Sequence, residues 1–464
     1  MNKLWNMLIL AGMMLAVAAC VKSPCNFPPD DTSVKIDSTN LPIVWIEVGG
    51  DSIMRDQRID AHMKIVHNGD GHLNYADTIA HPGQHIDYDG YIAVRHRGNS
   101  TYISSPKKPY SLRTLSEPLK KGGKKKKVSL LGMGKDNDWV LFAPYADKSM
   151  IRDQLTRELS QPWMELTPQG RFCELYLDGI YYGVHVLSEA VSKGKHRLAL
   201  NRPGEDGDAL TGDYLLEVDC NDETTYTSKH HPVTTDGKPI ADHRIQFQYK
   251  YPHIDDLSEA QLDYIHRRIN DMENSFETGN YAKYIDVASF IDYQLMMELC
   301  HNVDAYRLSG KFYKRRDSVD PRFKMVVWDT DLAYGNADHR QAWRIDTWMY
   351  ENNDIMLNEN EVYMVPSWWY WLNHDARYTS SLKRRWAELR ATHLSTQRVM
   401  ATVDSLAALL TTQRAEQRNS RAWPRWGVHV WPNHYDADSY TDEIAYIKRW
   451  LTERIAWMDS QLKQ

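Results

Sequence analysis

The sequence predicts an α+β fold that is rich in strands in its N-terminal half and helical in its C-terminal half. Short runs of alternating apolar residues, separated by Gly, Asn and Asp, occupy residues 41 to about 115, as in antiparallel strands joined by turns. From residue 258 onward the apolar residues recur with the period of a helix. Mostly strands followed by mostly helices is typical of an α+β body.

Residues 1–19 have the features of a lipoprotein signal peptide. They contain Lys3, an apolar run from Leu8 to Ala19, and small residues directly before Cys20. The run is too short for a membrane-spanning helix, which needs about 20 apolar residues, so we expect cleavage and lipidation at Cys20. Residues 20–40 are polar and rich in Pro, as in a tether. The sequence thus predicts a protein of the cell envelope, outside the cytoplasm and attached to the membrane through its lipid.

Composition and charge argue against some classes of function. Without residues 1–19 the chain loses one of its 56 Lys and Arg, which leaves 55 against 62 Asp and Glu and a net charge of −7. This mild acidity argues against a nucleic-acid-binding protein, which would have a basic surface. The remaining cysteines show no C-x-x-C spacing and predict no zinc site: Cys25, Cys173, Cys220 and Cys300. With 42% apolar residues the chain can bury a large core.

The elements of the N-terminal half begin near Leu41. We expect a strand-rich extension over residues 41–84, with one strand at Ile43–Val48, and a further strand at Tyr91–Arg95. The lysine-rich turn at residues 120–127 could attract phosphates, although a solvated hairpin tip is the better interpretation. A helix is predicted over Met150–Leu159, and Asp147 or Ser149 is its N-cap candidate.

A β-hairpin is the clearest element in the middle of the chain. Two strand-like runs between Phe172 and Leu187 flank Asp178-Gly179, a dipeptide that favours a tight hairpin turn. Another strand is predicted over Tyr214–Asp219. One helix opens at Ser258-Glu259-Ala260-Gln261, and a second opens at Asp286 or Ser289 and runs to about His301. Residues 365–464 are helical by pattern.

Two tracts in the second half have the residues of a phosphotransfer site. Asn302–Ser309 places a single Asp, Asp304, after a predicted helix, and Val326–Asn336 continues an apolar strand into Asp329-Thr330-Asp331. A lone Asp after a helix, followed by Asp-x-Asp after a strand, is how a kinase-like site supplies a base and magnesium ligands. Haloacid-dehalogenase-type phosphatases also use Asp-x-Asp, but here Ala333 stands where Thr or Val is expected.

These tracts, together with several others, resemble the spore-coat protein CotH family. The others follow in order along the chain: Arg95–Thr101, Pro106–Tyr110, Leu130–Met133, Asp138–Leu141, Asp147–Ser149 and Glu174–Gly179. The resemblance covers about residues 85–460 and assigns residues 85–464 to one CotH kinase-like domain. It implies an atypical protein-kinase-like fold. It also implies phosphorylation of Ser or Thr in protein substrates, with ATP and Mg²⁺ or Mn²⁺.

The candidate catalytic base is Asp304. Apolar residues of the preceding helix, among them Phe290 and Leu299, would anchor that helix and leave the carboxylate at the edge of the packed body. There it can accept the proton of a substrate hydroxyl. An Asp after a helix more often caps the next turn. The neighbouring tracts favour the catalytic interpretation.

The candidate metal ligands are Asp329, Asp331 and Asn302. Both carboxylates follow the predicted strand Phe323–Trp328. If the chain stays extended for two more residues, they project to one side and can share a hard cation; Asp329, directly at the end of the strand, is the first choice. A protein kinase places an Asn metal ligand five residues after its catalytic Asp. Here that position is Ser309, a poorer ligand, so Asn302 or Asn336 would have to replace it.

The candidate phosphate-binding residues are Arg97, Lys108 and Arg152. In a kinase, a strand Lys neutralises the nucleotide phosphates and pairs with a Glu, and Lys108 fits this role. Three carboxylates are possible partners: Glu174, Glu189 and Glu217. Alternatively, Lys108 is a surface cation whose aliphatic stem packs beside Tyr110, and Arg97 begins an ordinary polar turn.

An alternative function is that of a catalytically inactive relative, which binds or assembles a protein or glycan partner in the cell envelope. ATP is expected to be scarce outside the cytoplasm, so a kinase there needs a nucleotide source that the sequence does not reveal. The contact surfaces of such a binding protein would be Trp368–Trp371 and the aromatic run Trp423–Trp431. Packing between helices is the better interpretation of both tracts.

Overall fold

The computed structural model describes residues 27–220 and 225–463, and the chain forms two compact units. The barrel unit comprises the chain up to Tyr145, Gly170–Ala190 and Ala408–Arg425. The sheet unit comprises Ala146–Gln169, Val191–Ala407 and Trp426–Gln464. Strands dominate the first half of the described chain and helices the second, which confirms the predicted α+β class.

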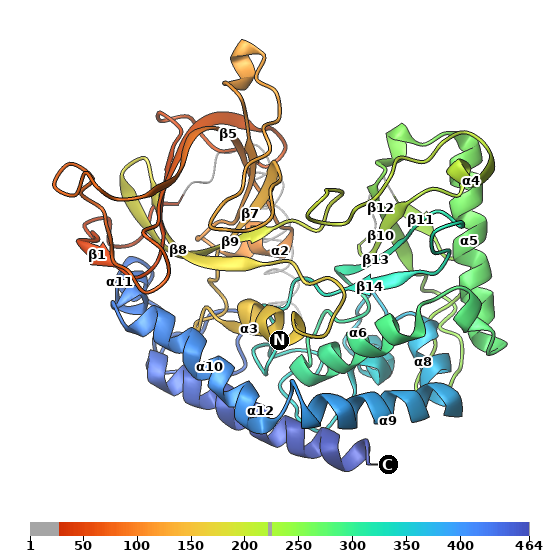
Figure 1. The fold of residues 1–464 in the computed structure, drawn as a ribbon. Helices are drawn as coiled ribbons and strands as arrows, with labels where there is room; N and C mark the ends of the chain where they lie inside the picture. Colours follow the sequence, from red (N-terminus) through yellow and green to blue (C-terminus); the bar gives the residue numbers. More distant parts are fainter. Residues whose placement is uncertain (1–26, 221–224, 464) are drawn as a thin grey trace, which may run out of the picture. The chain divides into compact units, whose positions relative to one another are not determined.

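The barrel unit is built on a closed barrel with the strand order β2-β3-β5-β6-β7-β9-β8 (Figure 1). Its strands are β2 (Ile43–Glu47), β3 (Ile59–Val66), β5 (Ile86–His96), β6 (Tyr110–Thr114), β7 (Asp138–Phe142), β8 (Gly170–Leu177) and β9 (Ile180–Glu189). Neighbouring strands are antiparallel except β2 and β8, which close the barrel in parallel with Ile43 opposite Glu174. Side chains such as Ile43, Met63 and Leu175 fill the core.

The predicted hairpin is confirmed as β8 and β9. Its turn residues both have a left-handed backbone, with φ of 46° at Asp178 and 78° at Gly179. This is the backbone that the two-residue turns of hairpins require. The lysine-rich turn lies between β6 and β7, and all six of its lysines are exposed, as expected for a solvated tip.

The packed chain begins earlier than its composition predicts. Val34 and Ile36 are buried in the barrel core, at 2% and 4% exposure, although a polar tether was expected up to residue 40. Strand β1 (Ser38–Thr39) pairs with β4 (Asn74–Tyr75), and the Thr39 hydroxyl donates to Glu174 at 2.9 Å. Residues 41–84, expected as a separate extension, supply β2 and β3 of the barrel.

Two glycines of the hairpin offer a matched test of the packing in this unit. Gly183 has a φ of +89°, and a Cβ there would lie 2.4 Å from Asn419 Oδ1. Asn419 has no room to move, because it is 1% exposed and its Oδ1 accepts hydrogen bonds from Lys107 Nζ and Val184 N–H. Gly179 has a φ of +78° and nothing within 4 Å of a Cβ.

We therefore expect Gly183→Ala to destabilise the protein far more than Gly179→Ala. The left-handed backbone costs each variant about 1 kcal/mol in free energy of unfolding, and overpacking adds about 2 kcal/mol for Gly183→Ala alone. Urea denaturation followed by circular dichroism measures both losses. Equal losses would show that α11 (Ala415–Ala422), which carries Asn419, does not pack on β9 as described.

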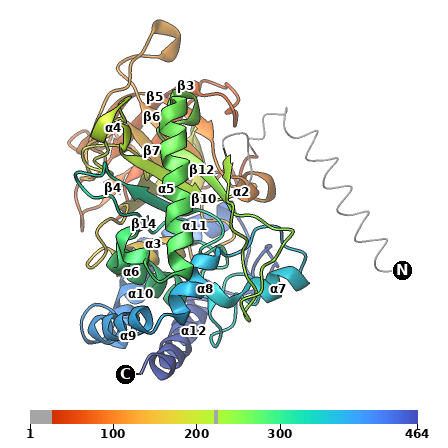
Figure 2. The same cartoon turned by 90° about the vertical axis from the view of Figure 1, so that its right-hand side faces the viewer.

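The sheet unit contains a five-stranded antiparallel sheet with the order β11-β12-β10-β13-β14. Its strands are β10 (Tyr214–Val218), β11 (Thr225–Thr227), β12 (Gln246–Tyr251), β13 (Gly310–Lys314) and β14 (Lys324–Val326). Helix α5 (Glu259–Glu277) runs along this sheet (Figure 2). Tyr249 of β12 donates to His266 of α5, and Tyr214 of β10 stacks on Tyr264 of α5.

Of the other helices of the described chain, those at residues 152–160 and 287–300 and those after residue 365 lie where the sequence predicts helices, whereas the short ones at residues 100–104, 207–210 and 353–358 were not predicted. These other helices are α2 (Ser100–Ser104), α3 (Arg152–Ser160), α4 (Gly207–Leu210), α6 (Val287–Cys300), α7 (Asn353–Asn358), α8 (Ser367–His374), α9 (Ala376–Ala391), α10 (Thr396–Thr411) and α12 (Tyr440–Gln461). Ser258 and Gln261 form the capping box predicted for α5. Asp286 is the N-cap of α6, since its side chain accepts from Ser289 N–H at 3.0 Å.

Candidate functional site

Asp304 lies in a tight turn that follows α6. The helix ends at Cys300, and His301 leaves it with a left-handed backbone. Leu308 N–H donates to the Asp304 carbonyl oxygen at 3.1 Å, and the Tyr306 hydroxyl donates to buried Glu298 at 2.8 Å. The turn is thereby fixed to the core, while the Asp304 side chain keeps 29% of its surface exposed. This is the placement at the edge of the packed body that the sequence predicts.

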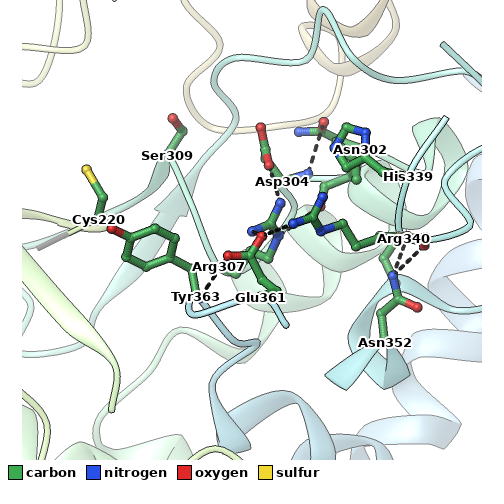
Figure 3. A network of polar contacts seen from close by, with 12 residues as sticks. Cys220, Asn302, Asp304, Arg307, Ser309, His339, Arg340, Asn352, Glu361 and Tyr363 are labelled. Atoms are coloured by element: carbon green, nitrogen blue, oxygen red, sulfur yellow. Dashed lines mark hydrogen bonds and ion pairs between the residues drawn. The ribbon is translucent and has the colours of Figure 1, made fainter. Parts of the chain in front are cut away.

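A network of ion pairs holds the Asp304 carboxylate (Figure 3). Arg307 donates to Asp304 Oδ1 at 2.5 Å, to Glu361 Oε2 at 3.0 Å and to the Val303 carbonyl oxygen at 3.0 Å. Arg340 donates to the same oxygen of Glu361 at 2.5 Å. The Arg307 side chain is only 2% exposed, so its three acceptors leave the guanidinium one orientation. The network therefore preorganises the candidate base.

Asp329 follows β14 in a conformation that differs from the predicted one. The strand ends at Val326 instead of continuing to Trp328, and Asp329 has a left-handed backbone with a φ of 62°. The chain is therefore not extended through Asp329. Val326 pairs with Lys311, the second residue of β13, so β14 reaches the end of its partner strand at this point. Two residues of the Asp304 turn hold Asp329 instead. The Ser309 hydroxyl donates to Asp329 Oδ2 at 3.1 Å, and Asn302 Nδ2 donates to the Asp329 carbonyl oxygen at 3.1 Å.

Ser309 therefore has a role that motif comparison did not suggest. It occupies the position at which a protein kinase has a metal-binding Asn, and in this structure its hydroxyl orients the Asp329 carboxylate. The Asn302 side-chain oxygen has only a long contact, 3.5 Å, with Asp304 N–H. Such a long contact is weak, so this oxygen can still take part in other interactions.

Asp331 is the centre of a concentration of negative charge. Burial raises the pKa of its carboxyl group well above the ordinary value, and the charges of Asp329, Asp153, Asp147 and Asp304 raise it further. Like charges this close favour a bound cation. Carboxylate and amide oxygens are also the ligands that Mg²⁺ prefers, and Mg²⁺ commonly uses one or two carboxylates together with water and phosphate oxygens. The donor set of Asp329, Asp331 and Asn302 therefore fits a hard divalent cation.

Among the residues that the structure describes, no group of three or more His, Cys, Asp and Glu side chains is placed to hold a metal ion by itself. A site here would accordingly be completed by the amide of Asn302, by water and by the substrate.

Helix α3 supports the loop that carries Asp329 and Asp331. Asp153 Oδ1 accepts from Thr330 N–H at 3.1 Å, and Arg152 Nε donates to the Ala333 carbonyl oxygen at 3.1 Å. Arg152 is 1% exposed and pairs with Asp147 at 2.7 Å and Glu443 at 2.5 Å. Arg152 thus contacts the backbone of this loop, and the carboxylates of Asp147 and Glu443 balance its charge. Its predicted contact with a phosphate stays a prediction.

Arg97 and Lys108 belong to the barrel unit, whereas the three aspartates and Asn302 belong to the sheet unit. The Lys108 side chain is buried, donates to the Tyr102 carbonyl oxygen and lies 4.9 Å from the centroid of the Tyr102 ring. The Arg97 guanidinium lies 4.9 Å from the centroid of the Phe142 ring, and Gly98 has the left-handed φ of 88° expected of a tight turn. A phosphate-binding role for either cation stays a prediction.

A buried Lys–Glu pair in the sheet unit was missed by sequence reasoning. Lys311 of β13 lies opposite Glu217 of β10 and forms an ion pair with it, and Lys250 contacts the other oxygen of Glu217 at 2.7 Å. Although burial alone would raise it, the two ammonium groups hold the pKa of Glu217 below its ordinary value. Lys311 Nζ also lies 5.8 Å from the centroid of the ring of Trp328, the residue before Asp329. Only the register of β10 against β13 reveals this pair.

The other two carboxylates considered as partners of Lys108 are buried in the barrel unit. Glu174 accepts hydrogen bonds from Thr39 and Tyr181 and pairs with Arg418. Glu189 lies on β9 and is 6% exposed.

Three of the aromatic residues considered as contact surfaces pack in the interior. Trp368 and Trp369 are 1% exposed, and Trp423 is 2% exposed. Their packing confirms the interpretation as helix contacts. Trp431 differs, because 54% of its surface is exposed.

The predicted lipidation site, Cys20, and the signal peptide lie outside the described residues. Within the described ranges, no helix is both long and apolar enough to cross a membrane. Cys173 and Cys300 are free and buried, as expected of small core residues, and Cys220 is partly buried.

Comparison with known protein families gives one finding. A family model described as CotH kinase protein matches residues 94–458. The comparison with curated proteins gave no match.

Proposed function

The chain belongs to the CotH kinase family, and on that premise we propose that it is an atypical protein kinase that transfers phosphate from ATP to Ser or Thr hydroxyls of a protein substrate. The observation that supports this most directly is the arrangement around Asp304. The partly exposed carboxylate of Asp304, fixed by Arg307, lies in the same turn as Ser309 and Asn302, which hold Asp329.

Asp304 is the proposed base. The carboxylate oxygen that Arg307 does not contact accepts the proton of the substrate hydroxyl, as the hydroxyl oxygen attacks the terminal phosphorus of ATP. The bond between that phosphorus and the bridging oxygen of ADP breaks in the same step. Arg307 acts through Asp304 as a positioning residue, since its guanidinium binds the other oxygen.

Asp329, Asp331 and Asn302 are the residues that would hold Mg²⁺ or Mn²⁺. The bound cation would neutralise the charge of the ATP phosphates. The Ser309 hydroxyl keeps the Asp329 carboxylate in one orientation for metal binding. Asp153 and Arg152 fix the backbone of the loop by hydrogen bonds to Thr330 and Ala333.

Lys311 with Glu217 is the proposed pair that faces the nucleotide phosphates within the sheet unit. A phosphate-binding Lys needs a carboxylate partner to stay charged when buried, and Glu217 supplies it. A second proposed set of phosphate contacts consists of Arg97, Lys108 and Arg152. Its main members are Arg97 and Lys108, which belong to the barrel unit.

We expect the protein to act at the cell envelope, anchored through a lipid on Cys20. ATP or another phosphate donor would then have to reach the protein outside the cytoplasm. The proposed substrate class is a protein of the same compartment.

The experiment that tests the proposed function is phosphate transfer by the purified full chain from labelled ATP, with Mg²⁺ or Mn²⁺, to itself and to generic proteins rich in Ser and Thr. We expect labelled phosphate on Ser or Thr only when the metal is present. Absence of label with either metal, from a protein that circular dichroism shows to be folded, contradicts the kinase assignment and favours the inactive binding protein.

Lys311 provides a prediction with an internal control. We expect Lys311→Met to lower kcat/KM for ATP about 100-fold, because a charge-assisted contact to phosphate is lost. Lys250→Met removes the other cation that contacts Glu217. It should lower kcat/KM by less than about threefold, because the Lys250 side chain is 34% exposed and its ion pair is partly solvated. Steady-state kinetics over a range of ATP concentrations measures both.

Lys311→Met also leaves a buried carboxylate with a single partner, which can destabilise the fold. The double variant Glu217→Gln/Lys311→Met removes that problem, since both charges are lost together. If the folded double variant keeps the wild-type kcat/KM, Lys311 does not face the phosphates.

A further inference from the structure

An exposed tryptophan, Trp431, packs on a largely buried histidine, His339, which lies near the candidate base (Figure 3). Trp431 stacks on His339, with ring centroids 6.0 Å apart and planes 11° apart. Trp431 is 54% exposed, so a large part of its surface stays accessible beside His339. We call Trp431 and His339 the aromatic shelf. A large exposed aromatic residue in a fixed position is typical of a binding surface.

The backbone on both sides of the shelf is fixed by hydrogen bonds. Asp338 N–H donates to the Pro432 carbonyl oxygen at 2.8 Å, and Ala337 forms a β-bridge with Asn433. Asn433 Nδ2 donates to Asn336 Oδ1 at 2.9 Å. The shelf is therefore rigid before any partner binds, which lowers the entropic cost of binding on it.

The segment that carries His339 is also strained. Arg340 and Gln341 follow each other with left-handed backbones, at φ of 49° and 54°. Three contacts stabilise this conformation: Arg340 N–H donates to Glu359, Arg340 pairs with Glu361, and Asn352 donates to the Arg340 carbonyl oxygen at 2.8 Å. Strained backbone that is held by its surroundings is concentrated at functional sites.

A short chain of contacts joins the shelf to Asp304. Arg340, next to His339, shares Glu361 with Arg307, and Arg307 binds Asp304 (Figure 3). In the view of Figure 3, His339 and Ser309 lie on opposite sides of Asp304. Ser309 is the residue that contacts Asp329. His339 is thus on the side of the base opposite Ser309, where the amide of Asn302 also lies.

The charges near the shelf favour a protein segment over a nucleotide. Four carboxylates surround the network, those of Asp304, Asp338, Glu359 and Glu361, against the guanidinium groups of Arg307 and Arg340. The excess negative charge repels phosphates that carry no metal ion. Val362, the residue after Glu361, is 59% exposed.

We propose that the aromatic shelf receives an apolar or aromatic side chain of the protein substrate close to the hydroxyl that is phosphorylated. This inference rests on the proposed kinase function and names the residue that selects its substrates. Trp431 then acts as a specificity residue, while Asp304 carries out the proton transfer. Three residues of an extended substrate chain span about 10 Å. We therefore expect the selected side chain within about three residues of the phosphorylated Ser or Thr.

The test uses short peptides with one Ser and a Gly/Ala background, in which Trp, Leu or Gly is placed in turn at each neighbouring position. The full chain, Trp431→Ala, Trp431→Phe and Tyr91→Ala are compared with Mg²⁺ and ATP. Tyr91 is a matched control, because it is 43% exposed and also packs against a histidine, His62, but belongs to the barrel unit. ATP hydrolysis without peptide reports on the transfer site alone.

We expect the wild-type chain to prefer Trp or Leu over Gly at one position by about tenfold in kcat/KM. Trp431→Ala should lose this preference while its ATP hydrolysis stays at the wild-type rate, and Trp431→Phe and Tyr91→Ala should keep it. A preference that survives Trp431→Ala overturns the inference. So does a higher KM for ATP in Trp431→Ala, which would assign the shelf to the adenine ring. No ATP hydrolysis and no transfer in the wild-type chain would instead refute the proposed function.

Discussion

Asp304→Asn is expected to lower phosphate transfer about 10²- to 10⁴-fold while leaving the affinity for ATP unchanged. The amide is the same size as the carboxylate and still accepts a hydrogen bond from Arg307, so the turn keeps its shape. Only the ability to take the substrate proton is lost. Labelled-phosphate transfer measures the rate, and equilibrium dialysis with ATP and Mg²⁺ measures the affinity.

The control for this variant is Asp346→Asn. Asp346 is also an aspartate of the sheet unit with an Arg partner, Arg344, at 2.8 Å, but 46% of its side chain is exposed. Such surface pairs contribute little to stability. If the two variants transfer phosphate equally well, Asp304 is not the base and its ion pair with Arg307 is structural.

Asp329→Asn is expected to raise the Mg²⁺ concentration needed for half-maximal transfer by at least about 100-fold. The variant removes one negative charge from the donor set. It keeps an oxygen for the Ser309 hydroxyl and a residue type that tolerates the left-handed backbone. The measurement is the transfer rate as a function of Mg²⁺ concentration at saturating ATP.

The same titration with Ser309→Ala distinguishes orientation from ligation. If Ser309 only orients Asp329, its loss should raise the required Mg²⁺ concentration about tenfold, a smaller effect than that of Asp329→Asn. An unchanged Mg²⁺ requirement in Asp329→Asn would exclude Asp329 as a metal ligand.

Local patterns in the sequence were enough to predict many elements and the candidate aspartates. The capping box at Ser258 and the N-cap at Asp286 are encoded within one helical turn. The Asp178-Gly179 turn is encoded in two residues. Asp304, Asp329 and Asp331 stand next to the ends of a helix and a strand, so their neighbourhood could be predicted without long-range information.

Features that depend on long-range pairing could not be predicted in this way. The barrel closes through the parallel pairing of Ile43–Ile46 with Glu174–Leu177, about 130 residues apart in the chain. Lys311 and Glu217 meet only because β10 and β13 are neighbours in a particular register. The Arg307–Glu361–Arg340 network likewise joins three separate loops.

Composition was misleading at the N-terminal boundary. The polar, Pro-rich character of residues 20–40 indicated a tether, yet Val34 and Ile36 alternate into the barrel core. Two apolar residues are too few to form a periodic signal. The left-handed backbone of Asp329 was missed for a related reason. The residues of an apolar strand do not indicate where its pairing with the neighbouring strand stops.

The measurement that tests the central claim most directly is calorimetric titration of the wild-type full chain with ATP, first with Mg²⁺ and then with the metal chelated. The arrangement of Asp304, Asp329, Asp331 and Asn302 predicts binding that depends on the metal, because ATP phosphates would otherwise face an excess of carboxylates. No binding with Mg²⁺ or Mn²⁺, or the same affinity after chelation, would contradict a metal-dependent phosphotransfer site in this protein.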